Sequence, residues 1–328
     1  MIKKSVGKIF LKEYAFAFLI ILGMAAILFY PSSASSFSDG IKLWYACVLP
    51  SLFPYMFLTA MLSENKAAGK LAVKLSPVSE KVFRVNGTAL YAFFLSIVSG
   101  YPVGAKTVAD LSKKGYLKKS ETVRAAALCS TASPVFLLVS IGSIAFKNPF
   151  FGVLIFLTHF ISALTLGVIF SFYKRSDPPE KPTYISVNRS ANLLYESAEK
   201  SALTVFALGG IIAFFYLLTD ILFATGVLSP VSSLLTRVLG NENLGNGILF
   251  SLFECTKGLK TISLSGINFL TLPVCSAICG FGGISVIAQS MAFLKTAKIK
   301  TATFVLIKLA AAAVNFIIGL IFALLFFL

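Results

Sequence analysis

Charged residues are scarce in this sequence. Only 13% of the 328 residues are Asp, Glu, Lys or Arg, whereas 57% are hydrophobic and the mean hydropathy is +0.87. A soluble globular domain carries roughly 25% charged residues, so this class is excluded. Apolar runs long enough to cross a bilayer recur along the whole chain, which is typical of a polytopic membrane protein.

Acidic residues are rarer than basic ones. The sequence contains 13 Asp and Glu and 29 Lys and Arg, which gives a net charge of +16. Such an excess could indicate binding to nucleic acid. Most of the basic residues, however, lie in segments that can share one side of a membrane, which are 3–12, 66–84, 113–124, 174–200 and 295–300. The tendency of cytoplasmic loops to carry Lys and Arg explains this placement, so we expect no nucleic-acid partner.

Histidine and cysteine give little support for a metal centre: a metal pair at Cys275 and Cys279 is conceivable, but no histidine or carboxylate clusters there. The single histidine, His159, lies in an apolar span, where a packed or hydrogen-bonded role is favoured and a proton relay is the alternative. The five cysteines all fall in apolar segments and are expected to be buried as small hydrophobic residues: Cys47, Cys129, Cys255, Cys275 and Cys279. No nucleophile elbow, phosphate loop, zinc-ligand set or pair of acids is present, so the sequence predicts no catalytic residues, no metal and no enzyme.

The N-terminal segment 1–40 is predicted to be a transmembrane anchor followed by an outer loop. Residues 14–30 form a short apolar span behind four lysines, and residues 31–40 carry no basic residue. A cleaved signal peptide, with small residues at 32–36 as the cleavage site, remains an alternative. The lysines place the N-terminus in the cytoplasm.

The rest of the chain divides into two halves of the same plan. The first repeat covers 41–173, a basic cytoplasmic linker covers 174–198, and the second repeat covers 199–328. Each half contains in order a span, an interfacial helix, a re-entrant hairpin, a broken span and a span. Because each half then crosses the membrane three times, the halves must have opposite orientation. The sequence therefore predicts an all-α polytopic membrane protein with an inverted repeat, two re-entrant hairpins, broken transmembrane helices and seven crossings.

Four interruptions in apolar segments mark the predicted site. The hairpin tips lie at 99–106 and 254–258, and the broken spans are interrupted at 130–134 and 280–285. Unwound backbone at membrane depth needs partners inside the protein or a watery cavity, and transporters build midplane sites from such breaks. The candidate substrate-binding residues are Ser99, Gly100, Tyr101, Pro102, Gly104, Lys106, Ser130, Thr131, Ser133, Thr256, Lys257, Gly282, Gly283, Ser285 and Gln289.

The charge at these breaks favours an anionic or carboxylate-bearing solute. Helix N-termini after each break carry positive dipole ends, and Lys106 and Lys257 can add cationic charge. Alternatively, Lys106 pairs with Glu254 or extends to the interface. Glu254 is a candidate site for a coupling ion, H⁺ or Na⁺, with a structural ion pair as the alternative. Lys308, about a third of the way into the last span, is expected to extend towards the interface.

Three stretches at these breaks resemble one family. The segments 99–106 (SGYPVGAK), 254–258 (ECTKG) and 280–289 (GFGGISVIAQ) resemble the sporulation integral membrane protein YlbJ family, within the wider group of nucleoside-recognition or Gate-domain membrane proteins. The resemblance extends from about residue 41 to 320. It implies an architecture similar to that of concentrative nucleoside transporters. It also implies a role in spore formation, where a member is associated with moving dipicolinic acid across the membrane surrounding the forespore.

The favoured hypothesis is a secondary transporter that moves a small anionic metabolite, dipicolinic acid first, through a midplane site between the two hairpins. The alternatives are a carrier of nucleosides or other small solutes, and a non-transporting membrane assembly factor for sporulation. The predicted location is the bacterial cell membrane or the membrane surrounding the forespore. The expected partners are the solute and the lipid bilayer. The coupling ion, the direction of transport and homo-oligomerisation stay open.

Overall fold

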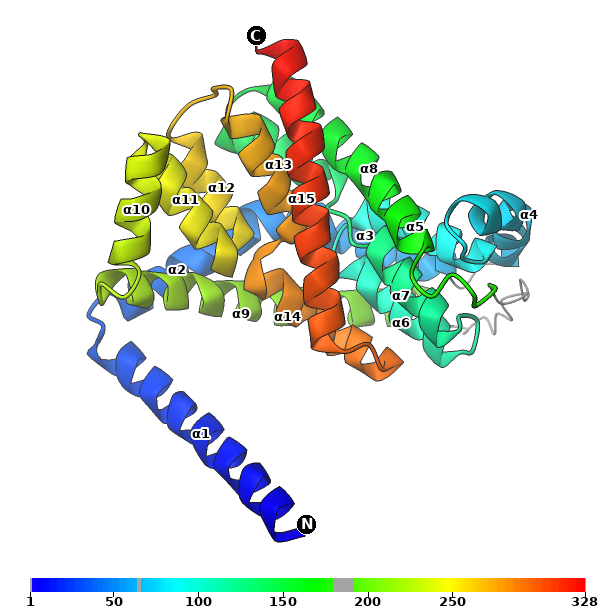
Figure 1. Cartoon of the computed structure of the whole chain (residues 1–328), viewed down its shortest axis with the longest axis horizontal. Coiled ribbons are helices and arrows are strands. Elements are labelled where there is room, and N and C mark those ends of the chain that lie inside the picture. The colour runs from blue at the N-terminus through cyan, green and yellow to red at the C-terminus, as the bar shows by residue number, and fades with distance from the viewer. Residues whose placement is uncertain (1, 64–65, 180–191, 328) are drawn as a thin grey trace.

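The computed structural model describes residues 2–63, 66–179 and 192–327, and every regular element in these ranges is a helix (Figure 1). Of the predicted linker 174–198, residues 180–191 lie outside the described ranges. The expectation of an all-helical chain is confirmed.

The N-terminal helix α1 (Ile2–Phe29) extends away from the body of the protein towards its N-terminal end (Figure 1), while its C-terminal part lines a space together with α9. The next helix, α2 (Ser33–Leu43), continues through a π-helical segment η1 (Trp44–Val48) into α3 (Leu49–Ser63). The prediction of an outer loop over 31–40 is therefore wrong from Ser33 onwards. The reason is packing against α9, since a Cβ at Gly40 would lie only 2.7 Å from the Cα atom of Ala213. A small residue here lets two helix backbones approach closely.

The first half follows the predicted order of elements. Helix α4 (Lys66–Val82) meets α5 (Gly87–Ser99) at an angle of 96°, and α6 (Val103–Lys113) follows the first hairpin tip. Helix α7 (Lys119–Leu128) ends before the break, after which a π-helical segment η2 (Val135–Ala145) and α8 (Pro149–Ser171) complete the half. Both predicted breaks therefore fall between helices.

The second half has a matching order. It contains α9 (Leu193–Ala224), α10 (Ser229–Leu239), α11 (Glu242–Phe253), α12 (Cys255–Ser263), α13 (Thr271–Phe281), α14 (Gly283–Leu294), the short η3 (Lys295–Ala297) and α15 (Thr301–Phe326). The predicted breaks at 254 and 282 separate α11 from α12 and α13 from α14. The pairing of the halves as an inverted repeat stays a prediction.

Within the described residues, five helical segments are long and apolar enough to cross a membrane: Ser33–Leu62, Pro149–Ser171, Leu193–Ala224, Thr271–Ala297 and Thr301–Phe326. The count rises to six if the bent pair α4–α5 is one span. The polytopic class is thus confirmed in its coarse form, while the count of seven crossings and the re-entrant path of the hairpins stay predictions.

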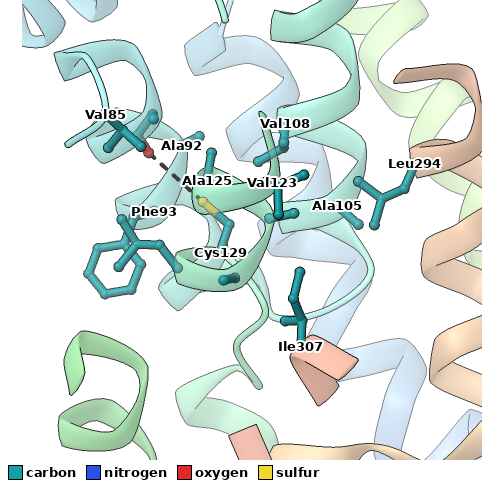
Figure 2. Packing of buried hydrophobic residues seen from close by; sticks show 14 of the residues in the cluster. Val85, Ala92, Phe93, Ala105, Val108, Val123, Ala125, Cys129, Leu294 and Ile307 are labelled. Atoms are coloured by element: carbon teal, nitrogen blue, oxygen red, sulfur yellow. Dashed lines mark hydrogen bonds between the residues drawn. The ribbon is translucent and has the colours of Figure 1, made fainter. Parts of the chain in front are cut away.

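One buried cluster joins the two halves (Figure 2). Cys129 lies near its centre, beside Phe93 of α5, and the cluster extends to Ala105 of α6, Leu294 of α14 and Ile307 of α15. The Cys129 thiol faces the carbonyl of Ala89 at 3.9 Å. Alanines dominate this region of α7, and their small side chains let the neighbouring helices lie close to the extended segment that follows.

The tightest approach in this cluster is at Gly104, near the start of α6. A Cβ added there would overlap the carbonyl oxygen of Cys129 and the hydroxyl of Ser96. Overpacking of this kind destabilises proteins by about 1–3 kcal/mol. We therefore expect Gly104→Ala to lower the unfolding temperature of the detergent-solubilised protein, as measured by a thermal-shift assay.

Gly210→Ala is the matched control, because nothing lies within 4 Å of a Cβ on this exposed face of α9. Alanine is also the better helix former by about 0.5–1 kcal/mol, so this variant should be unchanged or more stable. If Gly104→Ala unfolded at the wild-type temperature, the close contact between α5, α6 and the extended segment would be contradicted.

Candidate functional site

A small central cavity of about 40 Å³ lies where the breaks of the two halves meet. The first half contributes Gly100 and Tyr101 from the hairpin tip and Ala132 and Ser133 from the broken span. The second half contributes Glu254, Cys255 and Thr256 from the other tip, with Val286 and Gln289 from α14. The remaining lining residues come from η1, α3, η2 and α9, and they are Val48, Ser51, Leu52, Phe136 and Ile212.

Six predicted site residues thus lie around one space: Gly100, Tyr101, Ser133, Glu254, Thr256 and Gln289. The residues of the first half lie at least 121 positions from those of the second half, and their proximity was predicted from the plan of the two halves. Their contact with a substrate stays a prediction. In this conformation the cavity has room for a few water molecules, since one water occupies roughly 10–15 Å³ by the same measure.

The first hairpin tip depends on glycine and tyrosine. Gly100 ends α5 with φ of 76°, a left-handed conformation that favours glycine. A Cβ there would also lie 2.6 Å from the backbone nitrogen of Ser133. The hydroxyl of Tyr101 reaches the thiol of Cys255, 4.0 Å away in the second hairpin tip. The two tips are therefore in direct contact.

The second hairpin tip depends on Glu254. This residue is extended, so it ends α11, and its carboxylate accepts a hydrogen bond of 2.7 Å from the backbone N–H of Lys257. Such a cap satisfies one of the unpaired donors at the start of α12 and stabilises it through the helix dipole. Glu254 is only 1% exposed and lines the central cavity. It therefore combines a structural role with a position suited to an ion site.

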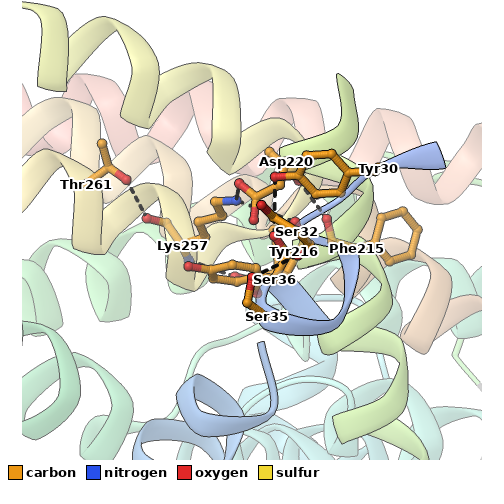
Figure 3. A network of polar contacts seen from close by, with 11 residues as sticks. Tyr30, Ser32, Ser35, Ser36, Phe215, Tyr216, Asp220, Lys257 and Thr261 are labelled. Carbon is orange, nitrogen blue, oxygen red and sulfur yellow. Dashed lines mark hydrogen bonds and ion pairs between the residues drawn. The ribbon is translucent and has the colours of Figure 1, made fainter. Parts of the chain in front are cut away.

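Lys257 forms an ion pair with Asp220 of α9 (Figure 3). Its ammonium also lies 4.0 Å from the ring centroid of Tyr216, and 3.4 Å from that residue's carbonyl oxygen. The ammonium of Lys257 is thus turned towards α9, while Thr256 beside it lines the cavity. The predicted role of Lys257 in substrate contact stays untested, but a carboxylate of the protein already neutralises its charge.

Lys106 lies in a second, larger space of about 340 Å³, which we call the vestibule. It is bounded by α3, α5, α6 and the first turns of α9, and its charged lining residues are Lys106, Asp110, Lys114, Glu196 and Lys200. Glu254 lines the central cavity instead, and no ion pair joins it to Lys106 in the described residues. The alternative in which Lys106 pairs with Glu254 is therefore wrong.

The first broken span is held by side chains of three other helices. Ser96 of α5 donates to the carbonyl oxygen of Cys129, and its oxygen lies 2.7 Å from that of Thr131. The backbone N–H of Ala132 donates to Nε2 of His159 on α8 at 2.9 Å. That bond leaves Nδ1 as the protonated nitrogen, which donates to Asn315 of α15 at 3.0 Å. The packed and hydrogen-bonded interpretation of His159 is confirmed.

Lys308 of α15 also supports the first broken span. The expectation that its side chain extends towards the interface was wrong. Its side chain is fully buried, with 0% exposure, and does not extend to an interface. Its ammonium donates to the hydroxyl of Ser130 at 3.1 Å and lies 5.0 Å from the ring centroid of Tyr101. Lys308 faces the protein because α15 packs between α8 and α13.

The other predicted residues serve the packing around the cavity. Ser99 is buried and donates to Thr59 at 3.4 Å, and Pro102 precedes the first turn of α6. Gly282 and Gly283 have φ of 78° and 80°, and a Cβ at Gly283 would lie 2.8 Å from the carbonyl oxygen of Ser251. The hydroxyl of Ser285 accepts a hydrogen bond of 3.0 Å from Gln289, which orients that amide at the cavity.

The cysteines behave largely as expected. Cys129, Cys255, Cys275 and Cys279 are buried free thiols, while Cys47 is partly exposed. Sequence reasoning missed Asp220 and Asn315, although both are polar residues within long apolar helices. That signal was available, because such residues face the protein interior in membrane proteins. Their partners, however, are distant in the sequence.

Apolar helices with broken segments meeting at a polar centre define a polytopic integral membrane protein. The chain is similar to the sporulation integral membrane protein YlbJ of Bacillus subtilis (strain 168), with 25% identity over 318 residues that cover 89% of this chain and 78% of the relative. This similarity supports the resemblance to the YlbJ family that the three stretches at the helix breaks carry. No protein-family model and no solved structure match the chain.

The ion pair between Lys257 and Asp220 yields a test of the second tip. Asp220→Leu leaves the ammonium of Lys257, whose side chain is 8% exposed, without its counter-charge. Breaking a fully buried pair costs about 3–5 kcal/mol, and the 26% exposure of the Asp220 side chain reduces the expected loss. A lower unfolding temperature of Asp220→Leu in a thermal-shift assay is the expected result.

The double variant Lys257→Met/Asp220→Leu should recover much of that loss, because apolar side chains of similar size often replace a buried pair without a penalty. A double variant as unstable as the sum of the two single variants would contradict a direct interaction.

Proposed function

We propose that this protein is a secondary transporter for a small anionic metabolite, with dipicolinic acid as the favoured substrate. The observation that carries the proposal is the central cavity, whose lining combines both hairpin tips, the first broken span and α14. Transporters of the inverted-repeat class bind their substrates at this kind of junction. The proposed site consists of the predicted residues that line this cavity, with Lys106 at the access route rather than at the centre.

The vestibule and the central cavity follow each other along α3. Met56 lines the vestibule and Leu52, one helical turn away, lines the cavity. Both belong to a buried apolar cluster with Val103 of α6 and Leu208 of α9. This cluster separates a space large enough for a small metabolite from one that holds only a few waters. We interpret the conformation as open to the vestibule and closed at the centre, one state of an alternating-access cycle.

The charge pattern supports an anionic solute. Lys106, Lys114 and Lys200 face the vestibule together with Asp110 and Glu196, and Lys200 bonds Glu196 at 3.2 Å. The basic residues favour the cytoplasm as the side of the vestibule. On this topology the N-terminus is cytoplasmic, and the solute exchanges between the vestibule and the cavity when the two tips move.

The Bacillus subtilis relative is named as a sporulation protein of the membrane. On the basis of that name, the proposal includes a role of this chain in spore formation, in the membrane surrounding the forespore. The alternatives are a nucleoside carrier of the Gate-domain type and a non-transporting assembly factor. Tyr101 and Gln289 at the cavity would also suit a nucleobase, whereas the lysines of the vestibule favour an anion.

Uptake of labelled dipicolinate into proteoliposomes tests the proposal, with Lys106→Ala as the informative variant. Loss of one cation from the access route should raise the substrate concentration for half-maximal uptake by about tenfold, as expected for electrostatic steering, with little change in maximal rate. The effect should shrink at high ionic strength. Lys300→Ala, an exposed residue before α15, is the matched control and should behave as wild type.

Uptake of nucleosides without uptake of dipicolinate would show that the protein is a nucleoside carrier and would contradict dipicolinic acid as its substrate. Absence of any uptake, with sporulation unaffected by Lys106→Ala and by Glu254→Gln, would favour the assembly factor.

Glu254→Gln tests the coupling ion. The amide oxygen of glutamine can still accept the hydrogen bond from the N–H of Lys257, so α12 keeps its cap. The variant cannot exchange a proton, however. Accumulation driven by a pH gradient should be lost, while exchange of labelled for unlabelled substrate across the membrane continues. Accumulation at the wild-type level would exclude Glu254 as the coupling site.

A further inference from the structure

We infer that Lys308 supplies the positive charge that binds the carboxylate of the substrate at the central cavity. This inference rests on the proposed function and adds to it a residue for which the sequence suggested only an interfacial position. Three observations support it: burial without a counter-charge, contact with two elements of the cavity wall, and the different surroundings of the other two lysines, Lys257 and Lys106.

The first observation is burial without a counter-charge. Lys308 is among the largest fully buried side chains, and in the described residues no carboxylate lies within ion-pair distance of its ammonium. The ammonium instead donates to the neutral hydroxyl of Ser130 and lies over the ring of Tyr101. An ammonium has three donors, and a buried charge without an ionic partner is rare in membrane segments and typical of functional sites.

The second observation is position. Tyr101 lines the central cavity, and Ala132 and Ser133, which line it as well, follow Ser130 within three residues. Lys308 therefore contacts the hairpin tip and the broken span of the first half, and each of these segments forms part of the cavity wall. A small rotation of Tyr101 or of the hairpin tip would expose the ammonium to a solute in the cavity. Asn315, further along α15, is instead hydrogen-bonded to His159.

The third observation concerns the other lysines. Lys257 is paired with Asp220, and Lys106 lies in the vestibule. Lys308 is thus the lysine near the central cavity whose charge no carboxylate of the described chain neutralises. A carboxylate of the substrate is the group that would do so, through a charge-assisted hydrogen bond.

The experiment measures binding and stability of Lys308→Met and Lys308→Gln. Methionine keeps the length of the side chain without charge, and glutamine keeps a donor for Ser130 without charge. The purified full-length protein is titrated with dipicolinate, glutarate and citrate, and with the uncharged pyridine-2,6-dicarboxamide. Lys300→Met is the matched control, because the same exchange is made at an exposed lysine.

Both Lys308 variants should bind the carboxylate at least about 30-fold more weakly, the factor expected for removing one member of a buried charge pair. Without ligand, the unfolding temperature of Lys308→Met should equal that of wild type or exceed it by up to about 2–4 °C, because an uncompensated buried charge is removed. The control should match wild type in both measurements.

The inference is overturned if either Lys308 variant binds the carboxylate as wild type does, which leaves the proposed function intact. It is also overturned if Lys308→Met unfolds at a lower temperature than wild type, because the residue would then act as a structural tie to Ser130. If wild type binds glutarate or citrate but not dipicolinate, and the variants lose that binding, the role of Lys308 is supported and dipicolinic acid is excluded as the substrate. If wild type binds none of the three carboxylates, both fall.

Discussion

Backbone groups freed at the helix breaks must find partners inside the protein, since hydrocarbon offers none. This constraint shapes the structure around the central cavity. The carbonyl of Cys129 is bound by Ser96, the N–H of Ala132 by His159, and the N–H of Lys257 by Glu254. Each bond needs a buried polar side chain on another segment, or at the break itself. The helices that carry these side chains are therefore fixed relative to the breaks.

The constraint also joins the two halves. His159 of α8 is oriented by Asn315, which is 156 residues away on α15, and Ser130 is bound by Lys308, two helical turns before Asn315 on α15. One face of the last helix thus supports the break of the first half. The same arrangement brings Tyr101 of the first tip against Cys255 of the second. A polar centre results, which leaves little space for a solute in this conformation.

The breaks could be predicted from the sequence because their signals are local. Glycine and proline at 100–104, glutamate at 254 and paired glycines at 282–283 interrupt apolar runs, and all three mark helix ends in the structure. The partners of these breaks could not be predicted, since the pairs Lys308–Ser130 and Lys257–Asp220 depend on how distant helices pack. The helix over Ser33–Leu43 was missed for the same reason, because its close contact with α9 is not encoded in its own polar composition.

The charges at the centre now have distinct surroundings. Lys257 and Asp220 neutralise each other, whereas the carboxylate of Glu254 lines the cavity and the ammonium of Lys308 lies over Tyr101. On the proposed function, an anion in the cavity is attracted by Lys308 and repelled by ionised Glu254, and both effects are strong where water is excluded. Protonation of Glu254 would remove the repulsion. Binding of the anion would then be linked to uptake of a proton at Glu254. On the proposed function, this distribution of charge would link the movement of the anion to that of a proton, with Glu254 as the candidate site for the proton.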